Sequence, residues 1–215
     1  MFITLEGPEG GGKSEGARWL GAWLVGHGYP VTLTREPGGT VLGERLRDVV
    51  LAAETPPSPL AALLLFSASR AELVQSVIRP ALDAGHLVIC DRYVDSTLAY
   101  QGFGDGLPLD ELRAVNHLAT GGLAPDVTFL LDVPAEVGLK RRADGGEWNG
   151  MDARNLAFHR RVREGFLTLA REDPPRWRVI DASITRDHVR DALIAGLPAG
   201  IGVAGNGEAR PTRDG

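Results

Sequence analysis

Short apolar runs recur along the chain, and most of them are rich in β-branched side chains. Such runs, bounded by turn-forming residues, are typical of buried β-strands. This pattern predicts five strands, at residues 2–5, 31–34, 87–90, 127–131 and 179–180.

The segments between these runs are longer and have apolar residues three and four positions apart. Ala17, Leu20 and Leu24 show this spacing in one segment, and Val162 and Phe166 show it in another. The spacing predicts helices that bury one face. Strands that alternate with helices form a mostly parallel sheet covered on both sides. We therefore predict a three-layer α/β fold around a central parallel five-stranded sheet, whose strand order the pattern leaves open.

The chain has 215 residues, of which 43% are hydrophobic and 24% are charged. These values are typical of one globular domain and exclude a largely disordered chain. Because no stretch resembles an interdomain linker, we expect a single domain over residues 1–197. Residues 198–215 lose the periodicity, which predicts a flexible C-terminal tail. No basic leader or run of about 18 apolar residues is apparent, so we expect a cytoplasmic protein without a membrane partner.

The charged residues and the single cysteine narrow the function further. The net charge of -5, without a basic tract, argues against nucleic acid as a partner. An anionic ligand must therefore be bound by a local cluster of cations. Lysine is rare among the 23 basic residues, since only Lys13 and Lys140 are lysines. Cys90 has no second cysteine with which to form an intramolecular disulfide, which fits a reducing compartment.

A glycine-rich loop joins the first predicted strand to the first predicted helix, and it consists of Gly7, Pro8, Glu9, Gly10, Gly11, Gly12, Lys13 and Ser14. It matches the pattern G-x-x-x-x-G-K-[ST]. Glycines let backbone N–H groups approach phosphate oxygens, Lys13 would reach the outer phosphates, and the Ser14 hydroxyl would ligate Mg²⁺. A turn that only caps a helix is the alternative, but the strand and helix on either side favour nucleotide binding.

Two arginines follow predicted strands closely. Arg35 comes directly after the second strand, and Arg92 lies two residues after the third. The carboxyl ends of parallel strands form the ligand-binding edge of an open α/β sheet, and arginine binds phosphate through two parallel hydrogen bonds. Both residues are thus candidates for binding an anionic acceptor. A surface ion pair is the alternative for each, because arginine is abundant here.

Several longer stretches resemble bacterial thymidylate kinases, a family of P-loop nucleoside monophosphate kinases. They are residues 2–14, 34–40 (TREPGGT), 65–70 (LFSASR), 91–93 (DRY), 96–102 (STLAYQG) and 125–139 (PDVTFLLDVPAEVGL). TREPGGT together with AYQG is far more specific than the glycine-rich loop, which many families share. The resemblance implies a P-loop NTPase fold with a short lid, at about residues 140–154. It also implies transfer of a phosphoryl group from MgATP to dTMP, giving dTDP for dTTP synthesis, by a cytoplasmic homodimer.

The resemblance also implies a role for individual residues in binding dTMP. Phe66 would stack on thymine, Arg70 would reach the base edge, and Arg35 and Arg92 would hold the phosphate. Tyr100 would lie under the sugar, where a 2′-hydroxyl would clash. The rest of the nucleoside pocket would be formed by Ser96, Thr97 and Gln101. Ordinary core packing is the alternative for Phe66 and Tyr100.

The implied catalytic residues are Lys13, Arg92, Asp91 and Glu9. Glu9 would face the sugar and the acceptor phosphate, and Asp91 would act on Mg²⁺ directly or through water, with helix capping as its alternative role. A loop near the end of the chain would lie beside adenine. The weak adenine contacts assigned there are Ala182 and Ser183.

The chain departs from the family pattern in two places. Glu15 and Gly16 follow the loop where the family has a hydroxyl residue and Gln, which places a carboxylate beside the phosphates. Residues 143–152 contain no arginine, although members whose loop lacks arginine usually have several in this lid segment. One hypothesis is that Arg141 or Arg142 takes the lid role in ATP binding. The alternatives are an attenuated nucleotide-binding protein of the same fold, or a kinase for another deoxynucleoside monophosphate.

Overall fold

The computed structural model describes residues 1–51, 57–145, 150 and 152–201. Its central sheet consists of β1 (Phe2–Glu6), β2 (Val31–Arg35), β3 (Leu87–Asp91), β4 (Val127–Asp132) and β5 (Trp177–Asp181). All five predicted strands are confirmed, and each continues one residue further at its carboxyl end. That extra residue is charged in every strand, and all of them except Glu6 are at least partly exposed. An apolar-run criterion therefore misses it.

The strand order is β2-β3-β1-β4-β5, and every neighbouring pair is parallel. The central strand β1 lies between β3, where Leu5 is paired with Asp91, and β4, where Glu6 is paired with Leu130. After β1 the chain forms the outer strand β2, inserts β3 between β2 and β1, and then crosses to β4 and β5, so the connections that follow the neighbouring strands β1 and β4 run in opposite directions. Ligands bind at such switch points, outside the carboxyl ends of the strands.

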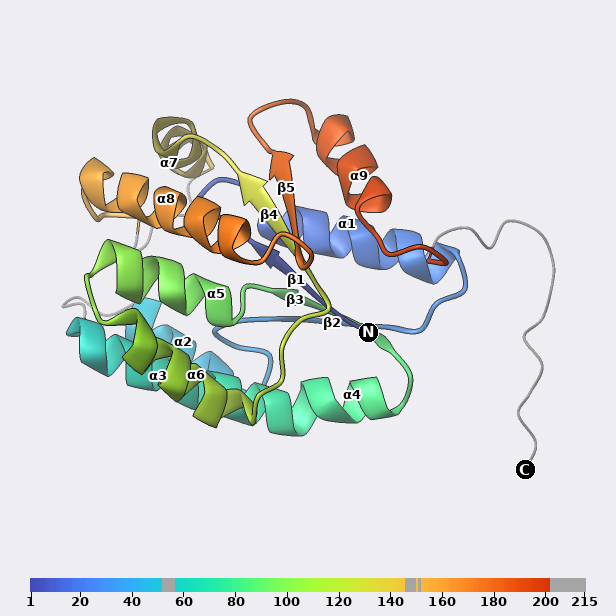
Figure 1. The fold of residues 1–215 in the computed structure, drawn as a ribbon, viewed down its shortest axis with the longest axis horizontal. Coiled ribbons are helices and arrows are strands. Elements are labelled where there is room, and N and C mark those ends of the chain that lie inside the picture. Colours follow the sequence, from blue (N-terminus) through green and yellow to red (C-terminus); the bar gives the residue numbers. More distant parts are fainter. Residues whose placement is uncertain (52–56, 146–149, 151, 202–215) are drawn as a thin grey trace.

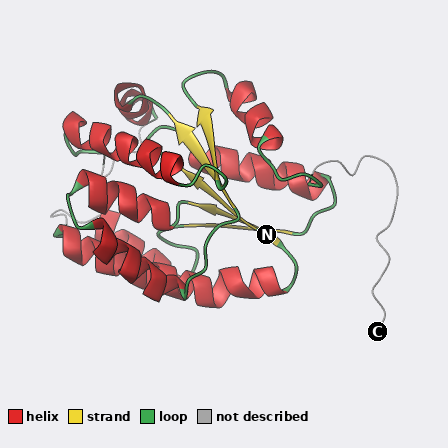
Figure 2. Cartoon of the chain, in the orientation of Figure 1, coloured by secondary structure: helices red, strands yellow, loops and turns green. Residues whose placement is uncertain are grey.

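Helices cover both faces of the sheet, which confirms the predicted three layers (Figures 1 and 2). They are α1 (Lys13–Gly26), α2 (Val41–Leu51), α3 (Pro59–Leu73), the π-helical turn η1 (Val74–Ile78), α4 (Arg79–Asp83), α5 (Val94–Thr97), the π-helical turn η2 (Leu98–Gly104), α6 (Leu109–Thr120), α7 (Ala135–Asp144), α8 (Leu156–Glu172) and α9 (Arg186–Ala195).

The two-residue period of the strands divides the core into two parts. Ile3 and Leu5 of β1 pack against Leu20 of α1 and Leu193 of α9. Phe2 points to the opposite face, where it joins the cluster of α3, η1 and α4. A further cluster on that face is built by α8 and η2. Figure 1 shows α1 and α9 on one side of the sheet and α3, α4 and α8 on the other.

One continuous helical stretch, Pro59–Asp83, is long and apolar enough to span a membrane by length and composition. A core helix passes the same test, and this stretch contains a buried arginine, Arg70. Its apolar residues Leu73 and Ile78 pack in the core against the sheet. The helical stretch therefore belongs to the layer that covers one face.

The predicted tail begins within the packed structure. Ile201 packs against the core cluster of α1 and α9, and the carbonyl of Gly200 accepts a hydrogen bond from the Tyr29 hydroxyl at 3.1 Å. Residues 202–215 lie outside the described part of the chain. The folded domain thus extends at least four residues beyond the predicted boundary at residue 197.

Candidate active site

A pocket of about 870 Å³ opens at the carboxyl edge of the sheet. It is lined by the glycine-rich loop, the ends of β2 and β3, and the first turns of α5 and α9. The structure places almost all the predicted site residues in this lining. Gly7, Pro8 and Ser183 are the exceptions, and they contribute backbone carbonyl oxygens that accept hydrogen bonds from pocket side chains.

The glycine-rich loop leads directly into α1, as the motif predicts. Its glycines Gly7, Gly10 and Gly12 have positive φ angles of 140°, 71° and 83°, which L side chains rarely adopt. Lys13 is 7% exposed, and its Nζ donates to the Pro8 carbonyl at 2.7 Å. Burial and the neighbouring Arg92 lower the pKa of Lys13 to about 8. The loop therefore holds a cation inside the pocket in place for an anion.

Glycine has a second role in this loop, which sequence reasoning did not anticipate. A Cβ on Gly10 would overlap the backbone of Gly138 in α7, and a Cβ on Gly138 would overlap the Glu9 carbonyl oxygen. The loop and the helix that leads into the lid segment are thus in direct backbone contact. The shape of the loop depends on α7 as well as on its own sequence.

Ser14 and Asp91 bring two side chains with possible oxygen ligands for a metal ion together at the mouth of the pocket. The Ser14 hydroxyl donates to the Asp91 carboxylate, and the Ser14 side chain is otherwise exposed. Mg²⁺ prefers oxygen ligands and usually combines one or two protein ligands with phosphate oxygens and water. The two side chains therefore fit Mg²⁺ that is bound to a nucleoside triphosphate.

Arg92 occupies the centre of the pocket, between the glycine-rich loop and α5. Its Nη2 donates to Glu9 Oε2 at 2.8 Å and to the Tyr100 hydroxyl at 3.1 Å, and its Nη1 donates to Ser96 Oγ at 3.1 Å. Burial by itself raises the pKa of Glu9, but Arg92 and Lys13 outweigh it and lower that pKa to about 2. Glu9 is thus ionised at neutral pH and holds the guanidinium group in place.

Tyr100 serves the pocket and the core together. Its hydroxyl donates to Glu9, and the Arg92 guanidinium lies 4.9 Å from the centre of its ring. The same ring makes an edge-on contact with Phe166 in the α8 cluster. Tyr100 is thus packed in the core and also lines the pocket with its hydroxyl group.

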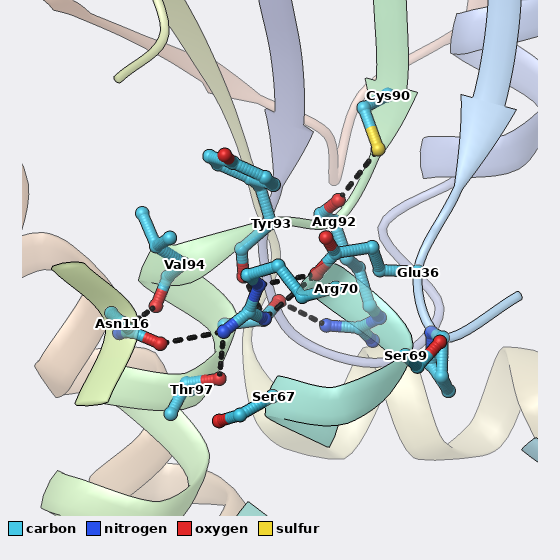
Figure 3. A network of polar contacts seen from close by, with 12 residues as sticks. Glu36, Ser67, Ser69, Arg70, Cys90, Arg92, Tyr93, Val94, Thr97 and Asn116 are labelled. Atoms are coloured by element: carbon cyan, nitrogen blue, oxygen red, sulfur yellow. Dashed lines mark hydrogen bonds and ion pairs between the residues drawn. The ribbon is translucent and has the colours of Figure 1, made fainter. Parts of the chain in front are cut away.

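Arg70 lies in a buried network on the acceptor side of the pocket (Figure 3). It is 2% exposed and makes a buried ion pair with Glu36 at 2.7 Å. Its remaining N–H groups donate to Thr97, Asn116 and the carbonyl of Tyr93. Four of the five donors of its guanidinium group have hydrogen-bond acceptors in the protein, and Nη2 also lies 2.7 Å from Glu36 Oε2, so a contact with a base edge would compete with these partners.

Two further arginines face this end of the pocket. Arg35 is exposed and donates to Glu44 at 2.9 Å, so the surface ion pair considered for it exists, and the residue also lines the pocket. Arg47 of α2 lines the pocket too and donates to the Pro37 carbonyl at 2.9 Å. Sequence reasoning missed Arg47, because nothing local distinguishes it from the many other arginines.

Comparison with known proteins agrees with this geometry. The family model of thymidylate kinase matches residues 5–193. The curated thymidylate kinase of Deinococcus radiodurans is 50% identical over 197 residues, covering 92% of this chain and 96% of the relative. That of Roseiflexus castenholzii is 53% identical over 209 residues, covering 91% of each chain. The chain belongs to the thymidylate kinase family.

A solved structure supports the same assignment at the level of the fold. The crystal structure of thymidylate kinase from Ehrlichia chaffeensis superposes with a TM-score of 0.74 at 34% identity, covering 91% of this chain and 97% of that one. The three-layer fold with a parallel five-stranded sheet is therefore the fold of the thymidylate kinase family.

The first departure from the family pattern is balanced by α9. Arg186 Nε lies 3.4 Å from Glu15 Oε1, so the additional carboxylate faces a cation. Gly16 lies against Leu5 and Leu193, where a Cβ would be only 3.2 Å from the Leu5 side chain. The missing side chain thus allows α9 and β1 to pack closely against α1. The pair Glu15 and Gly16 is accommodated by this chain's own α9.

The arginines beside the lid segment differ in their surroundings. Arg141 donates to the carbonyls of Gly10, Ala182 and Ser183, at 3.3, 2.7 and 3.2 Å. These contacts join the glycine-rich loop, called the phosphate loop below, to the loop at Ala182 and Ser183 that is predicted to lie beside adenine. Arg142 forms an ion pair with Asp152, at 2.9 Å. Residues 146–149 and 151 of the predicted lid lie outside the described part of the chain.

The contact between Gly10 and Gly138 generates a first prediction. We expect Gly138→Ala to destabilise the fold by about 1–3 kcal/mol, because the new methyl group would overlap the backbone of the phosphate loop and force it to shift. It should also weaken MgATP binding, because the displaced backbone is the phosphate loop. Urea denaturation and calorimetric titration would measure both effects. Gly26→Ala is the control, because a Cβ there meets nothing within 4 Å; wild-type stability and affinity in Gly138→Ala would contradict the prediction.

Proposed function

We propose that the protein transfers the γ-phosphoryl group of MgATP to dTMP, giving dTDP and ADP for dTTP synthesis. The observation that carries this proposal is the position of Arg92. Its guanidinium group lies beside the buried Lys13 of the phosphate loop and contacts Glu9, Ser96 and Tyr100 of the acceptor side. One pocket thus presents cations to a donor and to an acceptor that are both anionic.

The chemistry of the acceptor explains why cations dominate the pocket. A phosphate monoester has a second pKa of about 6, so dTMP is mostly a dianion at neutral pH. This dianion needs no general base, and no histidine is among the described residues that line the pocket. The task is to align two polyanions and to stabilise the charge on the transferred group. Lys13 and Arg92 lie where they can do both.

The metal in this reaction comes with the nucleotide. Ser14 and Asp91 would hold Mg²⁺, whose contribution is to offset the charge of the phosphate oxygens. Asp91 is the last residue of β3, and its pairing with Leu5 of β1 keeps the carboxylate next to the loop.

The acceptor end supports a thymine nucleotide with a deoxyribose. Phe66 lines the pocket and would stack on the base, with Arg70 at the base edge. Arg35 and Arg92 would hold the phosphate of dTMP. Arg35 would exchange its exposed ion-pair partner Glu44 for the phosphate. The Tyr100 ring is fixed between Arg92 and Phe166, so it cannot move away from a ribose 2′-hydroxyl. The nucleoside pocket is completed by Ser96, Thr97 and Gln101.

The donor end supports binding of ATP along the phosphate loop. Ala182 is buried and lines the pocket beside the predicted adenine position, while Ser183 contributes its carbonyl to Arg141. We assign the lid role to Arg141, because it contacts the phosphate loop and this second loop simultaneously. Arg142 already neutralises the buried carboxylate of Asp152.

The proposed reaction is tested by ADP release from MgATP. We expect release with dTMP, and little with dUMP, dCMP, dGMP or no acceptor. Arg92→Ala should lower kcat by about 100- to 1,000-fold, the typical cost of removing one donor that stabilises transition-state charge, with little change in MgATP affinity. Arg171→Ala is the matched control, since its ion pair with Glu164 is exposed. ATP binding without dTMP-dependent release would exclude the proposed function.

Because residues 143–152 contain no arginine, a nucleotide-binding protein with attenuated catalysis is the alternative to an active kinase. We expect Arg141→Ala to lower kcat by at least tenfold, toward the range reported for catalytic arginines at phosphoryl-transfer sites. Gly150→Arg should change kcat by less than about twofold, because an arginine already serves the site. Among the described residues, the one atom within 4 Å of a Cβ built on Gly150 is the Leu51 carbonyl oxygen, at 3.9 Å. A large rise in kcat for Gly150→Arg would instead indicate a deficient lid.

We also infer a cytoplasmic homodimer that needs neither nucleic acid nor a membrane. The support is an exposed apolar face on α2 and α3, which pack against each other. Leu60 and Leu64 of α3 are 57% and 54% exposed, and Val41, Leu42 and Val49 of α2 are exposed beside them. Apolar patches of this kind mark protein interfaces, and a cyclic dimer is the commonest arrangement.

The dimer is tested with a charge in this face. We expect Leu64→Glu to convert the dimer to a monomer in analytical ultracentrifugation, because each copy would have to bury an unpaired carboxylate in an apolar interface. Val179→Glu, at an exposed position on the edge strand β5, should leave the dimer intact. A wild-type chain that sediments as a monomer at micromolar concentration would contradict the inference.

A further inference from the structure

Glu6 is a buried carboxylate for which neither the motif nor the proposed reaction provides a role. It is the last residue of β1, directly before the phosphate loop, and it is 0% exposed. A carboxylate so far from water requires strong hydrogen bonds to be tolerated. Its Oε1 accepts from the backbone N–H of Tyr93 at 2.7 Å, and its Oε2 accepts from the Ser96 hydroxyl at 2.6 Å. Both partners adjoin Arg92.

The backbone at Arg92 explains why the first of these bonds matters. Arg92 is the only non-glycine residue with positive φ in the described part of the chain, at 71°. This left-handed conformation is unfavourable for a residue with a side chain and persists only where the surroundings impose it. Three bonds impose it here. The Arg92 N–H donates to the Leu5 carbonyl at 3.0 Å, Cys90 Sγ donates to the Arg92 carbonyl at 3.0 Å, and Glu6 binds the N–H of Tyr93. Figure 3 shows the contact of Cys90 with Arg92.

The second bond of Glu6 acts on the Arg92 side chain. Ser96 Oγ, which donates to Glu6, also accepts from Arg92 Nη1 at 3.1 Å. Glu6 therefore fixes the oxygen on one side of the guanidinium group, while Glu9 binds it on the other side at 2.8 Å. Glu6, at the end of β1, thus constrains both the backbone and the side chain of Arg92. Glu9, in the loop that follows β1, constrains the side chain.

We propose that Glu6 is the positioning residue for Arg92, holding the turn at Arg92 and the Ser96 hydroxyl so that the guanidinium group faces the acceptor phosphate. This inference rests on the proposed function, because it assumes that Arg92 binds the phosphate of dTMP. Glu6 acts through hydrogen bonds and touches neither substrate. Its role is separate from that of Glu9, which contacts the guanidinium group directly.

Shape, and not charge, is what this role requires. The pKa of Glu6 is raised to about 8, mainly by burial and to a smaller extent by the charge of the nearby Asp95. Burial thus favours the neutral form of this carboxyl group. A glutamine has the same length: its carboxamide oxygen accepts from the Tyr93 N–H, and its N–H donates to Ser96 Oγ, which keeps that contact with the direction of the hydrogen bond reversed. An aspartate keeps the charge but is one methylene shorter, so it cannot reach both partners. The two substitutions therefore separate geometry from charge.

The test compares binding of dTMP with binding of thymidine, which lacks the phosphate, by calorimetry. We expect Glu6→Asp and Glu6→Ala to weaken dTMP binding by about 10- to 100-fold, as when a hydrogen bond to a charged group is lost. Thymidine and MgATP affinities should change less than about twofold, and kcat should fall with the dTMP affinity. Glu6→Gln should restore most of the dTMP affinity and of kcat.

Thr4→Val is the matched control, because Thr4 lies two residues earlier on the same face of β1. Its hydroxyl shares a buried hydrogen bond of 2.9 Å with Thr128, so its loss lowers thermal stability without reaching Arg92. We expect this variant to keep the wild-type ratio of dTMP to thymidine affinity.

Two outcomes would overturn the inference. Equal weakening of dTMP and thymidine binding would show that Glu6 only maintains the pocket as a whole. Loss in Glu6→Gln as large as in Glu6→Asp would show that hydrogen-bond geometry is not its contribution. If Glu6→Ala does not fold, the comparison of the other two variants still decides. A wild-type chain that turns over no dTMP would overturn the proposed function itself, which is a separate result.

Discussion

The ion pair between Arg92 and Glu9 is the interaction on which the rest of the site depends. It joins the end of β3 to the phosphate loop across 2.8 Å, within reach of Tyr100 and Ser96. Parallel pairing of β1 with β3 brings the two residues together, because both strands end at the same edge of the sheet. The donor and acceptor halves of the pocket are therefore held in fixed relation by the sheet and by one guanidinium group.

The ion pairs of the pocket differ in burial, and this difference separates structural from exchangeable arginines. Arg70 and Glu36 are almost fully buried, and breaking such a pair leaves an uncompensated charge in the core. Arg35 and Glu44 are about half exposed, and pairs of this kind contribute about 0–1 kcal/mol. A phosphate can displace Glu44 from Arg35 at little cost. The pocket is thus cationic toward ligands even though the whole chain is acidic.

Both residues that depart from the family pattern after the glycine-rich loop lie beside α9. The carboxylate of Glu15 faces Arg186, and the absence of a side chain at Gly16 lets Leu193 of α9 approach closely. Arg141, at the end of α7, reaches the backbone on both sides of the nucleotide site. The shape of the phosphate loop and of the first turn of α1 thus depends on the packing of α7 and α9.

The sequence by itself determined the layers of the fold, the phosphate loop and the family, because these depend on local periodicity and on contiguous motifs such as TREPGGT. It also indicated Arg92, whose position after a strand is a local feature. Only the tertiary structure decided the roles of Arg47, Arg186 and Glu6. Glu6 and Arg186 lie far along the chain from their partners, and strand order and helix packing bring them together. Arg47 is ten residues from Pro37, and the fold of α2 brings it to the pocket. A carboxylate at the end of a strand looks the same in sequence whether it is exposed or, like Glu6, buried beside the turn at Arg92.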